Sequence, residues 1–380
     1  MMEKRAHIDG NKGSVILKRE KVLKIVQELC RIKGSFTVGE LASTLNIPRS
    51  TANDWVARLL KTGLLERTEA AKGRRPARYI RKAPSEPPIS PCKRIFVTLD
   101  FKSGLAEIYH ECMSVGALNY CAKEYSKSGG SITHAFIEGP LLRLRTLLSA
   151  QKEVKVGKPP LPAIGVVGFE AEGEEAVILV KAFGGPSYSL IRAMNYAYGV
   201  QGVEWLKRGE HYYGKIKVRA YEHLSIGIDD TDKEGEGATW ALAIELMGEL
   251  KNRIDVELIG HKVVQLYPYI DEKTGGNYAS LIEVAVPPNL KEEAMHVAYE
   301  FVASKTKSPN TSLAFLWGLL VPAGVKNFLS LARKGRVTVH DALNEVKTLR
   351  EVMIKEVTGS RGCIGAMAAL ACSDPSVSMV

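Results

Sequence analysis

An apolar segment that ends abruptly in three acidic residues is the feature that most restricts how this chain folds. Residues 224–228 have the pattern of a short strand, and Asp229, Asp230 and Asp232 follow it directly. A glycine-containing loop and a helical pattern come next. Carboxylates suit Mg²⁺, which shares oxygen ligands with phosphates, and the N–H groups at a helix start attract anions. The stretch predicts a nucleotide-phosphate site; the alternative for so short a motif is an acidic loop that caps the helix through Thr239.

The length and composition of the chain indicate a soluble protein with more than one domain. Its 380 residues allow for two or three domains, each with its own core. A hydrophobic content of 45% and a charged content of 25% are typical of globular proteins. We find neither an 18-residue apolar run nor a signal peptide, and the six cysteines form no CxxC pair. We therefore expect a cytoplasmic protein with reduced thiols and no membrane partner.

The excess positive charge is confined to the first fifth of the chain. Residues 1–82 contain 19 Lys and Arg against 8 Asp and Glu, whereas the remaining residues contain 33 against 34. Charge concentrated in this way predicts a discrete anion-binding module at the N-terminal end.

Three helices and a basic hairpin are predicted within this module. The patterns, in order, are a flexible tail over residues 1–17, helices over 18–32, 38–45 and 49–60, and strands over 64–67 and 77–80. The order over residues 18–82 resembles the winged helix-turn-helix of prokaryotic transcription regulators. In such folds the third helix enters the major groove of DNA and the wing touches the backbone.

The resemblance makes exposed residues of the third helix and of the wing the candidates for nucleic-acid contact. They are Arg49, Ser50, Thr51, Asn53 and Arg58 on the helix, and Lys72, Arg74, Arg75 and Arg78 on the wing. The alternative is a basic module that binds protein or RNA, or that only dimerises.

A proline-rich linker leads from this module into a second block. Residues 83–91 contain four prolines, which favour a stiff, extended connection. Residues 92–222 show strand and helix patterns and predict an α+β domain. The strands are expected over 94–100, 105–110, 164–169 and 176–183, and the helix over 188–198, opened by Gly184–Ser187. No motif in this block indicates what it does.

Residues 223–372 carry four motifs in the order found in one known enzyme family. The first is Gly227–Asp232, followed by glycine and by Thr239 at a helix start. The others are Leu266–Asn277, with its Lys-Thr-Gly-Gly-Asn end, a partial match at Ser308–Thr311, and Gly359–Leu370. Together they resemble the kinase-like domain of the archaeal tRNA(Ile) agmatidine synthetase, TiaS, and the related methanogenesis-marker proteins.

The resemblance implies a site for ATP and Mg²⁺. Asp229, Asp230 and Asp232 would hold the metal, and cations would neutralise the phosphate oxygens. Thr239 stands where a threonine accepts phosphate in TiaS. The residues expected to act in catalysis are Asp230, Thr239, Lys273 and Arg361. Those expected to bind the nucleotide are Gly237, Thr239, Lys273, Gly275, Gly276, Asn277, Arg361 and Gly362, with Gly365 as a further glycine of the fourth motif. The alternatives are a solvated loop cation for Lys273 and a surface salt bridge for Arg361.

The chain also departs from TiaS. That enzyme continues into an OB-type domain and a zinc ribbon that grip tRNA, and we expect neither in the residues up to Val380. Trp240 stands where the family has a second threonine, and a proline late in its Lys-Thr segment is absent. We therefore expect ATP and Mg²⁺ binding to carry over, but not the agmatine and tRNA substrates.

The expected fold is multidomain, with an α-rich winged helix-turn-helix followed by two α+β domains. The last domain, residues 223–380, would be TiaS-like. Its elements are expected as helix 238–250, strands 254–259, 261–267 and 279–286, helix 290–304, strand 312–318 and helices from 325 onward. We expect the helices to lie on one side of the sheet.

Three functions fit these features. The first is an archaeal DNA-binding regulator whose Mg-ATP module senses nucleotide or transfers phosphate. The second is an ATP-dependent RNA- or tRNA-modifying enzyme, and the third is a small-molecule kinase or ligase with a regulatory winged helix. Duplex DNA is the expected partner rather than RNA or tRNA, together with a nucleotide, and a homodimer is allowed for.

Overall fold

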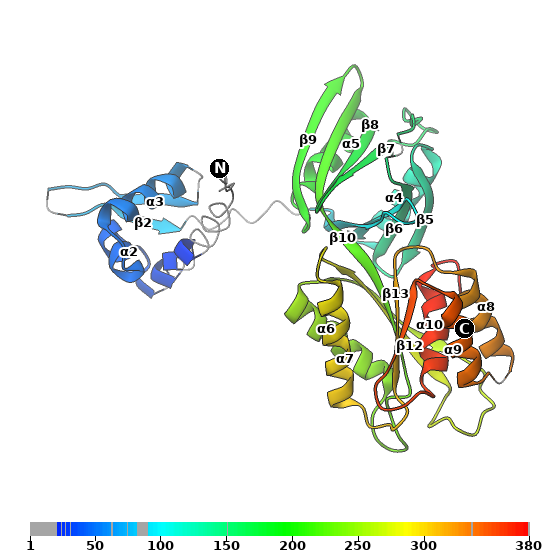
Figure 1. Ribbon diagram of the computed structural model, residues 1–380. Coiled ribbons are helices and arrows are strands. Elements are labelled where there is room, and N and C mark those ends of the chain that lie inside the picture. The colour runs from blue at the N-terminus through cyan, green and yellow to red at the C-terminus, as the bar shows by residue number, and fades with distance from the viewer. Residues whose placement is uncertain are drawn as a thin grey trace, which may run out of the picture. The chain divides into compact units, whose positions relative to one another are not determined.

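The computed structural model describes residues 21–378, apart from residues 24, 27, 31, 62–63, 74, 82–89, 150 and 336 (Figure 1). The chain forms two compact units, Met1–Ile89 and Ser90–Val380. The predicted tail, residues 83–89 of the predicted linker and Arg74 lie outside the described residues. Among the described helices, none combines the length and the apolar character needed to cross a membrane.

The first unit has the three helices and the hairpin that the sequence predicts. Residues 21–33 are helical where they are described, and the elements that follow are α2 (Val38–Leu45), α3 (Arg49–Lys61), β1 (Leu65–Glu69) and β2 (Arg78–Arg81). Thr37 and Glu40 form a capping box that starts α2, and Asn46 ends it in the left-handed conformation with φ of 52°. The antiparallel pair of β1 and β2 is the predicted wing. The winged-helix prediction is confirmed.

The second unit contains twelve strands and seven helices among the described residues. The strands are β3 (Cys92–Asp100), β4 (Leu105–Cys112), β5 (Ile132–Glu138), β6 (Leu141–Leu147), β7 (Ile164–Glu172), β8 (Glu175–Phe183), β9 (Val200–Arg208), β10 (His211–Asp229), β11 (Glu257–Gln265), β12 (Tyr278–Val286), β13 (Ser312–Trp317) and β14 (Val352–Glu356). The helices are α4 (Val115–Lys127), α5 (Gly184–Met194), α6 (Thr239–Ile254), α7 (Lys291–Lys305), α8 (Ala323–Lys334), α9 (Val339–Thr348) and α10 (Cys363–Leu370).

The strand β10, 19 residues long, runs through most of this unit (Figure 1). Its first half, His211–Arg219, pairs with β8 and β9. Residues 220–222 pair with β3 in parallel, and residues 222–229 pair with β12 and β13. The division predicted between residues 222 and 223 falls inside β10, so the blocks on either side of it share one strand.

The C-terminal part is a three-layer arrangement. The sheet has the order β11-β12-β10-β13-β14, with α6 and α7 on one face and α8, α9 and α10 on the other (Figure 1). Leu224, Ile226 and Ile228 pack toward α6 and α7. The expectation of helices on one side only is wrong. The reason is that β12 is buried on both faces after Tyr278, so both faces need cover.

Some elements differ from those expected. The two strands predicted over 254–259 and 261–267 are one strand, β11, because the register shift between Leu258 and Gly260 is a β-bulge rather than a turn. Gly184–Ser187 forms the first turn of α5 instead of a loop ahead of a helix. The elements α4, β5, β6, β9 and β14 were not expected at all.

Buried charges join strands that lie far apart in the large sheet. Arg143 of β6 is 1% exposed, and its guanidinium contacts Glu107 of β4 and lies 3.1 Å from Glu283 of β12. Glu283 also pairs with His223 at 3.2 Å and with Lys262 at 2.8 Å. Burial alone would raise the pKa of Glu283, but Arg143 and Lys262 hold it well below its usual range. This cluster therefore ties β4 and β6 to β10, β11 and β12.

Replacing Arg143 should destabilise the protein strongly. Arg143→Leu leaves Glu107 and Glu283 buried without their main countercharge, so the free energy of unfolding should fall by about 3–5 kcal/mol. Urea denaturation at pH 7 measures the loss. Because the folded-state pKa of Glu283 is depressed, its contribution is present above the ordinary value of 4.5 and is lost as the pH falls. The difference between wild type and variant should therefore shrink in acid.

The matched control is Arg253→Leu. Arg253 pairs with Glu249 and Glu300 on the surface, at 3.7 and 3.5 Å. Its removal should change the free energy of unfolding by less than about 1 kcal/mol. Equal losses in the two variants would contradict the role given to the buried cluster.

Candidate functional site

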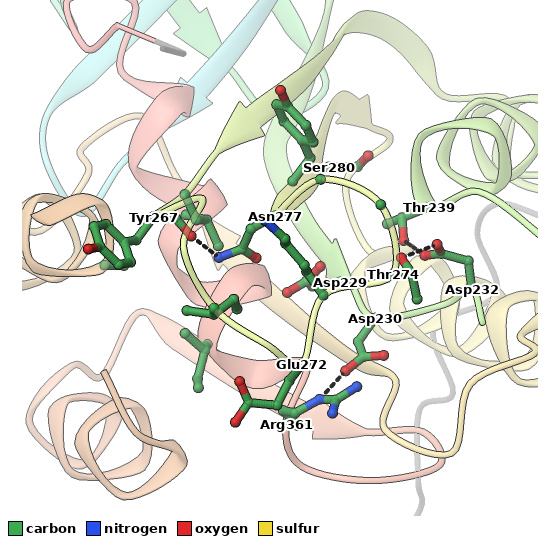
Figure 2. Close-up of a pocket in the computed structure, with 18 of the residues that line it drawn as sticks. Asp229, Asp230, Asp232, Thr239, Tyr267, Glu272, Thr274, Asn277, Ser280 and Arg361 are labelled. Carbon is green, nitrogen blue, oxygen red and sulfur yellow. Dashed lines mark hydrogen bonds and ion pairs between the residues drawn. The ribbon is translucent and has the colours of Figure 1, made fainter. Parts of the chain in front are cut away.

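A cavity of about 660 Å³ opens where β10 ends and α6 begins (Figure 2). Four segments far apart in sequence line it: the acidic loop with the start of α6, the stretch that joins β11 to β12, the α8–α9 connection, and the residues ahead of α10. The predicted site residues among them are Asp229, Asp230, Asp232, Thr239, Lys273, Gly275, Gly276, Asn277 and Arg361.

The three acids lie together at one end of this cavity but have different partners. Asp230 accepts hydrogen bonds from Arg361 Nε and from Ser308 Oγ, both at 2.6 Å. Asp232 accepts one from Thr239 Oγ1 at 2.9 Å and one from Thr274 Oγ1 at 2.7 Å. Figure 2 shows the Asp230–Arg361 pair apart from the cluster of Asp232, Thr239 and Thr274. The acids thus have hydroxyl and guanidinium neighbours from several elements.

Asp229 is the acid whose charge is least compensated. Burial raises the pKa of its carboxyl to about 8, and the neighbouring Asp230 and Asp232 charges add to the rise. A hydrogen bond from the backbone N–H of Asp230 and the charge of Arg361 oppose it only in part. A carboxylate in this position lacks positive charge, which a cation would supply.

The oxygen atoms of these acids suit an Mg²⁺ ion that is also bound by the phosphates of a ligand. They suit less well a metal ion that is held by protein side chains alone. Within the described part of the chain, no three His, Cys, Asp or Glu side chains converge in a metal-holding geometry. Mg²⁺ usually takes one or two carboxylates and completes its shell with water and substrate phosphates. Asp229 and its acidic neighbours could supply the one or two carboxylate ligands that such a site needs.

The start of α6 faces the same cavity. The helix begins at Thr239, and no side chain caps it at Ala238. The alternative of an acidic loop capped through Thr239 is therefore not what the structure has. Thr239 Oγ1 instead donates to Asp232 and accepts from Thr231 Oγ1 at 3.0 Å. An uncapped helix start presents N–H groups and positive dipole to an anion.

Two other predicted residues line the cavity while bound to backbone. The Nδ2 of Asn277 donates to the carbonyl of Tyr267 at 2.8 Å, which closes the loop between β11 and β12. The ammonium of Lys273, which is exposed, contacts the carbonyl of Pro268. Their roles toward a nucleotide stay predictions.

Two predicted glycines do not line the cavity. Gly237, with φ of 90°, turns the chain beside Asp232. A Cβ on Gly362 would lie 2.7 Å from the carbonyl oxygen of Asp229, so this glycine admits protein backbone rather than a ligand. Their assignment to nucleotide binding remains a prediction that the lining of the cavity does not support.

Glycines also let α10 lie directly on β10. A Cβ on Gly227 would lie 1.9 Å from the carbonyl oxygen of Ala366, and one on Gly365 would lie 1.9 Å from Asp229 Oδ2. This close approach buries Asp229. The glycines of the fourth motif therefore position the acid.

An apolar wall of the cavity was missed by the sequence analysis. It is formed by Trp240, Val263, Tyr267, Tyr278, Val337, Val339 and Ile364. Tyr267 and Tyr278 sit within or beside the second motif and were available as a signal. Residues 332–339 carry no pattern that predicts their place here.

The winged helix places its predicted contacts as follows. On α3, Arg49, Ser50, Thr51, Asn53 and Arg58 are all exposed, and so are Lys72 and Arg75 on the hairpin. Arg78 differs because its Nε donates to Ser35 Oγ at 2.7 Å, which binds the hairpin to the loop before α2. Arg74 is outside the described residues. Nucleic-acid contact by these residues stays a prediction.

Two segments of the chain match models of known protein families. Residues 225–289 match the TiaS TCKD domain, and residues 24–76 match the MarR family. The resemblances inferred from the motifs are confirmed, although the third and fourth motifs lie beyond the TCKD match.

Individual proteins are also similar to this chain. An uncharacterized protein of Methanocaldococcus jannaschii, MJ0921, is 28% identical over 282 residues, which are 73% of this chain and 92% of that one. The crystal structure of TiaS in complex with an isoleucine tRNA and ATP is 25% identical and covers 40% of this chain, with a TM-score of 0.35. A tRNA fluorescent labeling enzyme is 26% identical over 39% of this chain, with the same TM-score. This chain spans 36% of the length of each solved structure.

Gly365→Ala should destabilise the protein because α10 would have to move away from Asp229. The expected loss is about 1–3 kcal/mol in the free energy of unfolding. The matched control is Gly248→Ala in α6, where a Cβ meets nothing within 4 Å. That change should be neutral or stabilising by up to about 1 kcal/mol. Urea denaturation of both variants measures the contrast, and a stable Gly365→Ala would show that the close packing is not required.

Proposed function

We propose that this chain is a DNA-binding regulatory protein that binds ATP with Mg²⁺ in the cavity at the end of β10. The supporting observation is the convergence on one cavity of three acids, the uncapped start of α6, Lys273 and Arg361. These groups come from distant segments, Asp230 and Arg361 being 131 residues apart in sequence. Only folding brings them together.

The shape and chemistry of the cavity suit a nucleoside triphosphate. Its volume lies within the range of small-molecule sites, about 300–1,000 Å³. Asp229 and a neighbouring acid would hold Mg²⁺, which neutralises phosphate charge. Arg361 and the start of α6 would bind phosphate oxygens. The apolar wall with Tyr267 and Tyr278 would cover the base.

Two observations keep phosphoryl transfer as a second candidate function. The hydroxyl of Thr239 donates to the Asp232 carboxylate at 2.9 Å, and a carboxylate so placed can take a hydroxyl proton. The same residues lie within the match to the TiaS TCKD domain. The protein should be purified with any nucleic acid that accompanies it and assayed for conversion of ATP to ADP or AMP, with and without that nucleic acid. Conversion would support transfer, and binding alone would support sensing.

Asp230→Ala should weaken ATP binding in MgCl₂ by about tenfold or more, because a carboxylate that would hold the Mg²⁺ between protein and phosphates is lost. Isothermal titration calorimetry measures the affinity. In EDTA the wild type should weaken as well, so that the two proteins become similar. The matched control is Glu234→Gln in the same loop, which is exposed and does not line the cavity. An unchanged affinity of Asp230→Ala for ATP would contradict the assignment of the site.

Arg49→Ala/Arg75→Ala should weaken binding to duplex DNA and reduce the slope of log K against log salt by about 2, one for each lost phosphate contact. Fluorescence anisotropy over a salt series measures both quantities. In the absence of ATP, Asp230→Ala should bind this DNA with the same affinity as the wild type. Strong binding of tRNA together with no binding of duplex DNA would contradict the regulatory proposal and favour the RNA-modifying alternative.

A further inference from the structure

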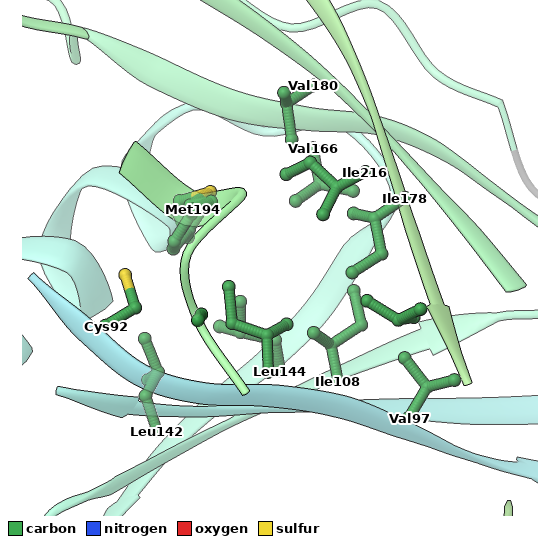
Figure 3. Close-up of a cluster of buried hydrophobic side chains, with 14 of the residues drawn as sticks. Cys92, Val97, Ile108, Leu142, Leu144, Val166, Ile178, Val180, Met194 and Ile216 are labelled. Carbon is green, nitrogen blue, oxygen red and sulfur yellow. The ribbon is translucent and has the colours of Figure 1, made fainter. Parts of the chain in front are cut away.

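The sheet formed by β7, β8, β10 and β9 has one covered face and one open face. Val166, Ile178, Val180 and Ile216 point from β7, β8 and β10 into a buried apolar cluster (Figure 3). The helix α5 packs on this same face, since a Cβ on Gly214 would meet Ile191. Because side chains alternate along a strand, their neighbours in sequence lie on the other face.

The open face carries a tyrosine between cations. Tyr213 on β10 is directly opposite Lys181 on β8 and Leu206 on β9. Lys181 Nζ lies 5.9 Å and Arg208 Cζ 5.7 Å from the centre of the Tyr213 ring. Lys215 follows on the same face of β10. In the part of the chain that the structure describes, neither Lys181, Arg208 nor Lys215 forms an ion pair.

The face is hollowed and partly apolar as well as basic. A groove of about 340 Å³ includes Leu179, Leu206, Tyr213 and Lys215 in its lining. Leu206 is 51% exposed, and Tyr213 is 37% exposed. Around Tyr213 the cations Lys181, Arg208 and Lys215 outnumber the acid Glu204, which lies opposite Lys215. Glu170 and Glu175 lie farther along the same face, and Glu175 pairs with Lys217 at 2.7 Å. The excess of positive charge is therefore local to the groove.

We propose that this face binds a single-stranded polynucleotide. Its phosphates match the cations of the face, and an unpaired base has an exposed π face that stacks on tyrosine, whereas bases in a duplex are already stacked. The apolar lining of the groove suits the flat face of a base, and cations that flank an aromatic ring along a strand follow the alternation of phosphate and base. Neither the winged helix nor the nucleotide cavity supplies any of these residues.

The place of the face along β10 also fits a polymer. Tyr213 and Asp229 lie on the same strand, 16 residues apart, which is up to about 50 Å at the usual rise. A small molecule on the face would have no contact with the cavity. A polynucleotide of about ten nucleotides or more spans such a distance.

The test uses the full chain without ATP, carrying Arg49→Ala/Arg75→Ala so that the winged helix contributes little. Fluorescence anisotropy is measured with a labelled 15-nucleotide oligo-U RNA, the corresponding oligo-dT DNA and a duplex DNA. Lys181→Glu/Lys215→Glu should weaken binding to one or both single strands at least about tenfold, and Tyr213→Leu should weaken it about fivefold or more. The matched control is Lys123→Glu/Lys127→Glu on the exposed face of α4.

The outcomes separate the sources and decide the proposal. If the variants lose affinity for the RNA alone, the face is assigned to RNA. If they lose affinity for oligo-dT alone, it is assigned to single-stranded DNA. The circular dichroism spectra of the variants must match that of the parent, and Tyr213→Leu keeps an apolar side chain so that one variant folds. The proposal is overturned if the parent binds neither single strand or if all variants bind as the parent does. It is also overturned if Lys123→Glu/Lys127→Glu loses as much affinity as Lys181→Glu/Lys215→Glu.

Discussion

Hydrogen bonding along both edges of β10 is the constraint on which the rest of the second unit depends. Its first half is held between β8 and β9, and its second half is held between β12 and β13. A central strand with partners on both sides fixes the register of every neighbour. The last residue of the strand, Asp229, is therefore placed by the whole sheet. A site built at the end of such a strand has rigid support on one side and loops, which are free to vary, on the other.

Burial and charge at Asp229 follow from how closely α10 packs. Gly227 and Gly365 bring the helix backbone onto the strand, and the carboxyl of Asp229 is partly shielded from water as a result. Its pKa is raised to about 8 because it is buried and because the site contains more acid than base. The buried cluster around Arg143 and Glu283 shows the opposite case, in which cations outweigh the cost of burial. The two clusters differ in whether a countercharge is built into the fold.

The sequence predicted those parts of the structure that depend on local pattern. The winged helix followed from helical spacing and the basic hairpin, both of which act within a few residues. That the site acids, Lys273 and Arg361 would lie near one another was expected from the resemblance of their motifs to TiaS, and all of them line one cavity. The role of Gly365 was not predicted correctly from its motif, because a glycine that admits a ligand and one that admits a helix look alike in sequence. The apolar wall and the Arg143 cluster rest on side chains brought together from distant strands, and no local pattern records such contacts.

The pairing of Arg361 with Asp230 bears on how the site would receive the proposed ligand. The guanidinium lies 2.6 Å from the Asp230 carboxylate and partly offsets the mutual repulsion of the acids. A divalent ion between the acids and the phosphates would provide that charge instead, and the strong attraction of a guanidinium for phosphate would then favour a shift of Arg361 toward the nucleotide. Arg361 precedes α10, the helix that packs on β10 through Gly365. Exchange of one partner for the other would therefore be felt at the contact between α10 and β10, which is the same contact that buries Asp229.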